Sequence, residues 1–213
     1  EEPPEGAVAR TVMPDVKMPT MNEHSRSSLV CSMYALLPAL GQQGWSIPRL
    51  EALTGYAFYF RMREGGESVF DDDLDWGLAM DVLDIFGQAK VYDASKNSDV
   101  DLPALKAEAR DAVVANLESG LPSLVWAPLS LEQKGRAHFS CWGLVVGHNS
   151  EDETYMIRQP AEELDYPVRF DAIGFADPSN WFRVGTFKPK DLDDNALHLT
   201  SLHNAVAFAH GTR

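Results

Sequence analysis

The hydrophobic spacing changes near the middle of the chain, and this change limits the folds that are available. Up to about residue 120 apolar residues recur at helical spacing, whereas later ones form short runs bounded by turn residues. Helical segments followed by antiparallel strands predict an α+β domain. The predicted helices cover residues 29–37, 46–54, 74–86, 101–119 and 193 to near the end. The predicted strands cover residues 90–92, 123–127, 138–147, 153–158 and 181–187, with a fragment near 168–170.

The first predicted helix carries a cysteine within about its first turn. Ser27 or Ser28 is the expected N-cap, and Pro38 should end or kink the helix near Leu37. Unpaired N–H groups and the helix dipole at this end favour a thiolate at Cys31, which is a common setting for a nucleophile. A buried cysteine in an ordinary core helix has the same pattern, and on this stretch alone it is the more common case.

Composition excludes several classes of function. The 213 residues carry a formal charge of −14, which opposes nucleic-acid binding. No apolar run approaches the roughly 18 residues of a membrane span, so none is expected. With two cysteines there is no disulfide framework and no zinc set, and the sequence indicates no metal or cofactor.

Proline content and periodicity predict three segments. Residues 1–26 read as an extended N-terminal arm, 27–190 as the α+β domain, and 191–213 as a C-terminal helix packed on it. The numbered chain does not begin with methionine, so a cytoplasmic protein and one exported after leader removal both stay open. The oligomeric state cannot be predicted.

Several short motifs follow one another along the chain. They are Cys31, Gly41, Trp45-Ser46-Ile47-Pro48, Leu53-Thr54-Gly55, Gly120 to Trp126, and Trp142 to Asn149. In this order they resemble motifs of two related enzyme families, the N-terminal domain of the butirosin-biosynthesis acyltransferases and the bacteriocin-processing (double-glycine) peptidases, both papain-like in fold. The resemblance spans about residues 28–160 and rests on the order and spacing of the motifs rather than on any one of them.

The resemblance implies a papain-like fold, a nucleophilic Cys31 and a histidine base at the start of a sheet strand. In the peptidase pattern this histidine lies six residues before the glycine that ends the strand. Counting back from Gly147 reaches Cys141, and His138 lies three residues further upstream. Because a regular strand alternates its faces, His138 and Cys141 cannot both face Cys31.

Two hypotheses follow. In one, His138 is the base and Gln159, near the family's Asp-Pro position, orients its ring. In the other, Cys141 replaces the histidine, the enzyme is degenerate, and Cys31 and Cys141 are close enough to form a disulfide in an oxidising compartment. The peptidases' oxyanion glutamine is replaced by Ser25, so Ser25 or the backbone N–H of Cys31 would donate to the oxyanion.

The remaining histidines carry less weight. His24 is expected to be an exposed arm residue, although it could approach Cys31, and His148 is expected in an exposed turn. His198, His203 and His210 lack the i, i+4 spacing of a metal-binding pair on a helix.

The sequence therefore predicts cysteine-dependent acyl chemistry on a peptide or a carrier-bound acyl group. The alternative is a catalytically degenerate papain-like module with a binding or structural role.

Overall fold

The computed structural model describes residues 10–13, 15–21, 23–25, 27–58, 82–95, 97–126, 141–160, 164–174 and 181–209. Within them the chain is an α+β structure, as predicted. The helices are α1 (Ser28–Leu36), α2 (Ile47–Leu53), α4 (Leu102–Glu118) and α5 (Asp194–Ala209). The strands are β1 (Arg10–Val12), β2 (Gly87–Ser95), β3 (Ser123–Trp126), β4 (Trp142–Asn149), β5 (Thr154–Arg158), β6 (Tyr166–Arg169) and β7 (Trp181–Pro189).

Some predicted elements lie partly outside the described residues. Of the predicted helix 74–86, residues 82–86 are described and helical. Of the predicted strand 138–147, the first three residues are not described. The strand predicted at 90–92 is longer in the structure, because it pairs along its whole length with β7.

Helix ends follow the capping residues of the sequence. The Ser27 hydroxyl accepts a hydrogen bond from the N–H of Val30 at 3.3 Å, and the Asp101 carboxylate accepts one from Ala104 at 3.2 Å. Helix α1 ends at Leu36, two residues before Pro38, so the proline terminates this helix rather than kinking it.

The seven described strands form one antiparallel sheet in the order β2-β7-β3-β4-β5-β6, with β1 also pairing with β4. Strand β1 lies within the predicted extended arm, where the sequence shows no strand signal. It pairs Thr11 with His148 of β4. Gly147 makes this close approach possible, since a Cβ there would lie 2.3 Å from the Thr11 carbonyl oxygen.

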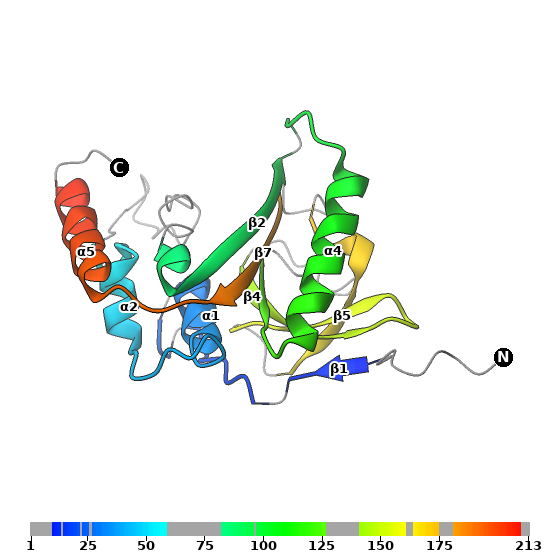
Figure 1. Cartoon of the computed structure of the whole chain (residues 1–213), viewed down its shortest axis with the longest axis horizontal. Helices are drawn as coiled ribbons and strands as arrows, with labels where there is room; N and C mark the ends of the chain where they lie inside the picture. Colours follow the sequence, from blue (N-terminus) through cyan, green and yellow to red (C-terminus); the bar gives the residue numbers. More distant parts are fainter. Residues whose placement is uncertain are drawn as a thin grey trace, which may run out of the picture.

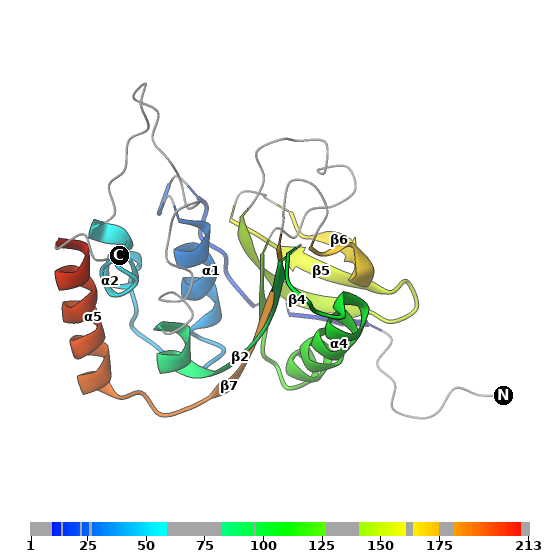
Figure 2. The same ribbon diagram turned by 90° about the horizontal axis from the view of Figure 1, so that it is seen from above.

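Helices cover both faces of the sheet (Figures 1 and 2): α1 packs on one face and α4 on the other. All residues of α1 except Tyr34 are buried, as expected for a helix that is apolar nearly all round. Helix α5 packs on α2, and the Asn204 side chain donates to the Leu53 carbonyl oxygen at 2.7 Å. None of the described helices is long and apolar enough to cross a bilayer.

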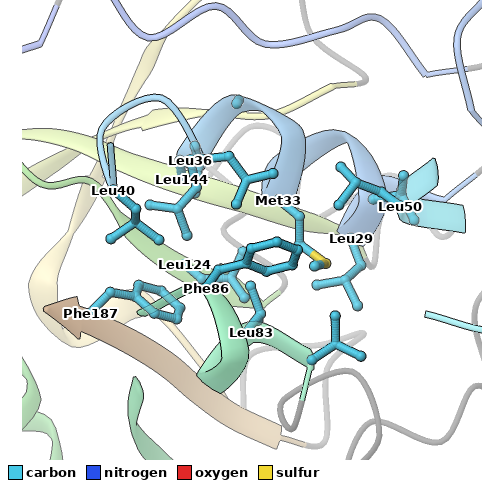
Figure 3. Close-up of a cluster of buried hydrophobic side chains, with 14 of the residues drawn as sticks. Leu29, Met33, Leu36, Leu40, Leu50, Leu83, Phe86, Leu124, Leu144 and Phe187 are labelled. Carbon is cyan, nitrogen blue, oxygen red and sulfur yellow. The ribbon is translucent and has the colours of Figure 1, made fainter. Parts of the chain in front are cut away.

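The core on the α1 side joins three parts of the chain (Figure 3). Met33 and Leu36 of α1 meet Phe86 from the helical residues 82–86 and Leu144 of β4. The cysteine helix α1 therefore packs on the sheet, as the papain-like resemblance implies.

Tyr155 of β5 gives the fold an expected sensitivity to alkaline pH. It is 4% exposed on the α4 side of the sheet, and burial raises its pKa well above the ordinary value of 10.0. Above pH 10 the unfolded chain loses this proton while the folded chain keeps it, so stability should fall by up to about 1.4 kcal/mol per pH unit.

This fall should be smaller in Tyr155→Phe, which keeps the ring but cannot ionise. Urea denaturation between about pH 8 and pH 11 measures it. Identical pH profiles for the two proteins would contradict the prediction.

Candidate active site

The N-terminus of α1 is joined to the start of β4 by a buried hydrogen bond. The Trp142 backbone N–H donates to the Ser28 hydroxyl at 2.9 Å. Ser28 is three residues before Cys31, so the two share one face of the helix, and Trp142 directly follows Cys141. The fold thus brings the cysteine end of α1 to the strand start on which both hypotheses depend.

Cys31 is a helical residue inside the protein. Its backbone N–H donates to the Ser27 carbonyl oxygen at 3.1 Å, and the residue is fully buried. The N–H that was considered as an oxyanion donor is therefore already used within α1. Cys31 and Cys141, the two cysteines of the chain, are both described, and no disulfide joins them.

The two faces of β4 point to different helices. Trp142, Leu144 and Val146 belong to the core on the α1 side, whereas Val145 belongs to the core that packs against α4. A β-bulge lies between Val145 and Gly147, beyond the part of the strand that faces the N-terminus of α1.

Cys141 and Gln159 form a buried pair. The Cys141 thiol donates to the Gln159 Oε1 at 2.7 Å. Gln159 is 1% exposed, and its Nε2 has no hydrogen-bond partner among the residues that the structure describes.

Ser25 is engaged at the end of the arm. Its hydroxyl donates to Glu51 Oε1 of α2 at 2.6 Å and accepts from the Ser27 N–H at 3.0 Å. A hydroxyl has one proton, so Ser25 must release Glu51 before it can donate to an oxyanion.

The histidines differ in position. His138 lies outside the described residues, and His24 is exposed, as expected. His148 is 3% exposed within β4, because the arm strand β1 pairs beside it. The prediction of an exposed turn at His148 is therefore wrong. His198 and His203 are exposed on α5.

Sequence reasoning missed the connecting role of Ser28. The pattern Ser27-Ser28 suggested two alternative caps, and the structure uses both hydroxyls, the first to cap α1 and the second to hold β4. A second serine next to an assigned cap is a weak signal for such a contact, because its partner is more than a hundred residues away.

Comparisons with known proteins give a structural likeness but no family. No family model matches the chain, and no curated protein matches it. A solved structure described as "putative C39-like peptidase from Bacillus anthracis" is similar to this chain at 15% identity and a TM-score of 0.46, a likeness on which no residue assignment depends. The match covers 85% of this chain and 99% of the other.

Proposed function

We propose that this protein carries out cysteine-dependent acyl chemistry in a papain-like site, with Cys31 as the nucleophile and His138 as the base. The substrate is a peptide or a carrier-bound acyl group. The role of each residue comes from the sequence resemblance, and the arrangement of α1 and β4 supports it.

The observation that carries the proposal is the hydrogen bond between Ser28 and Trp142, together with the orientation of β4. The bond holds the cysteine end of α1 against the strand start. The strand presents its even-numbered residues to α1, beginning at Trp142. His138 has the same parity, so a strand continued regularly upstream would direct it toward Cys31.

In the proposed reaction the Cys31 thiolate attacks the carbonyl carbon of an amide or thioester. The carbonyl oxygen takes the electron pair and becomes an oxyanion. The His138 imidazolium gives its proton to the leaving amine or thiol, and an S-acyl enzyme forms. Water or an acceptor amine then takes the acyl group, giving its proton back to His138.

Two supporting roles complete the proposal. Gln159 orients the His138 ring through Oε1, which must first exchange the Cys141 thiol for the imidazole N–H. Ser25 donates to the oxyanion once Glu51 has released it.

The second candidate is a degenerate module that keeps the fold without the chemistry. It is favoured by the complete burial of Cys31 and by the Ser25 proton already being donated to Glu51. In this case Cys31 is a core residue, and the Cys141–Gln159 pair is structural.

Iodoacetamide labelling across pH, with the modified cysteine mapped by mass spectrometry, separates the two candidates. In a Cys141→Ala protein we expect Cys31 to react well below pH 8, since an imidazolium partner stabilises the thiolate. His138→Ala should slow labelling at about pH 6 by roughly tenfold or more. Slow labelling at all pH values, or a profile unchanged by His138→Ala, would support the degenerate module.

Ser28→Ala tests whether the hydrogen bond to β4 positions the thiol. Loss of a buried acceptor should cost about 1–3 kcal/mol and should also slow Cys31 labelling. Ser32→Ala is the matched control, because Ser32 is a buried serine of the same helix whose hydroxyl has no hydrogen-bond partner within the described part of the chain. If both variants label at the same rate as the parent, the Ser28 contact does not position Cys31.

A further inference from the structure

A groove lies between the N-terminal arm and the part of α1 that carries Tyr34. It consists of two adjoining cavities of about 560 Å³ and about 530 Å³ that share Lys17, Tyr34 and Trp45. Cys31, three residues before Tyr34, is fully buried and lines neither cavity. Its other walls are the arm and the loop between α1 and α2. We call these two cavities the arm groove.

The arm wall is fixed at both ends and in the middle. The Met13 N–H donates to the Val146 carbonyl oxygen, and the Met21 N–H donates to that of Pro160, each at 2.8 Å. Between them, the Arg158 guanidinium donates to the Val16 carbonyl oxygen. A groove with such a wall is formed before a ligand arrives, which lowers the entropic cost of binding.

The opposite wall has a rigid aromatic surface. The Trp45 ring packs edge-on against Phe86, with ring centroids 4.6 Å apart. The Arg49 guanidinium lies 4.0 Å from the centroid of the same ring. Together with half-buried Tyr34, this surface suits an apolar side chain of a ligand.

The arm also has backbone groups available for pairing. No hydrogen bond is recorded within the described residues for the N–H groups of Val16, Lys17 and Met18, which belong to no helix or strand. A length of non-helical backbone with unpaired groups beside an apolar groove can accept an added strand. This favours an extended peptide over a compact small molecule.

Charge favours a carboxylate on that peptide. The chain carries a formal charge of −14, yet Lys17 lies where the two cavities meet and Arg49 covers Trp45. Asp15 lines only one of the cavities. An acidic group of a ligand would therefore be attracted to the centre of the groove.

We propose that the arm groove binds an extended peptide that places apolar side chains against Tyr34 and Trp45 and a carboxylate near Lys17. The peptide adds as a strand to residues 16–18 of the arm. This binding does not depend on the chemistry of Cys31, so it can hold whether or not the proposed function does.

The test uses fluorescence anisotropy with the Cys31→Ala protein, which removes any acyl transfer. The probe is a fluorescein-labelled heptapeptide of alternating leucine and threonine with an aspartate at its centre. We expect saturable binding that Lys17→Glu weakens by roughly tenfold or more. Arg110→Glu on α4, on the other face of the sheet, is the matched control and should leave binding unchanged.

Two N-methylated forms of the probe test strand addition, since each blocks the amides along one edge. One form should lose binding by roughly tenfold, and the other should bind like the parent. Lys17 is exposed, so Lys17→Glu should fold like the parent protein.

Four results would overturn the proposal. The first is the absence of saturable peptide binding up to about 1 mM, and the second is equal weakening of binding by Lys17→Glu and Arg110→Glu. The third is equal binding of both N-methylated probes. The fourth is binding of decanoate, an apolar carboxylate without amide groups, when the peptide does not bind.

Discussion

Truncation of Trp142 to alanine is expected to lower the free energy of unfolding by about 3–5 kcal/mol. Among the described residues Trp142 is the largest fully buried side chain, and it begins β4 at the point where this strand meets α1. The centroid of its ring lies 5.3 Å from the ring centroid of Trp126, its partner on β3. The substitution therefore removes apolar contact from the sheet and from the helix together.

Urea denaturation measures this change, and Trp181→Ala is the control. Trp181 also begins a strand, β7, but is 45% exposed. Its truncation should cost less than about 1 kcal/mol, because nearly half of its surface already contacts water. Equal losses in the two variants would show that the junction of α1 and β4 is not a centre of stability.

Replacement of Arg158 by methionine is expected to cost about 2–4 kcal/mol. Arg158 binds Asp165 through two hydrogen bonds, from Nε to Oδ1 at 2.7 Å and from Nη2 to Oδ2 at 2.5 Å. These bonds raise the pKa of the guanidinium. The two side chains are 17% and 26% exposed, so removal of the cation leaves a carboxylate with little access to water.

The same substitution should loosen the arm, since Arg158 also donates to the Met13 and Val16 carbonyl oxygens. Hydrogen exchange should become faster at Met13 and Met21, whose amides anchor the arm to β4 and to Pro160.

A double-mutant cycle with Asp165→Leu isolates the ion pair, and the double variant should recover part of the loss. Arg169→Met is the matched control, because the pair of Arg169 and Asp171 is exposed on both sides. The stability of Arg169→Met should equal that of the parent protein within experimental error. A loss of stability in Arg158→Met no larger than in Arg169→Met would show that Arg158 neither compensates the charge of Asp165 nor secures the arm.

Local signals predicted most of the elements, since each depends on neighbours in sequence. Ser27 and Asp101 cap the helices that follow them, and Pro38 ends the first helix. Strand β1 was not predicted, because its three residues have no pattern of their own and become a strand only by pairing with β4. His148 was misplaced for the same reason, since β1 covers a position that reads as a turn.

The candidate site divides in the same way. The sequence by itself determined that a cysteine lies near the N-terminus of an apolar helix and that a sheet strand follows more than a hundred residues later. Only the tertiary structure decided that Ser28 holds this helix to the strand, that Cys141 pairs with Gln159, and that Ser25 pairs with Glu51. These contacts join residues between 18 and 114 positions apart. Helix periodicity and capping act within a few residues, so they carry no information about which distant hydroxyl or amide a buried group will meet.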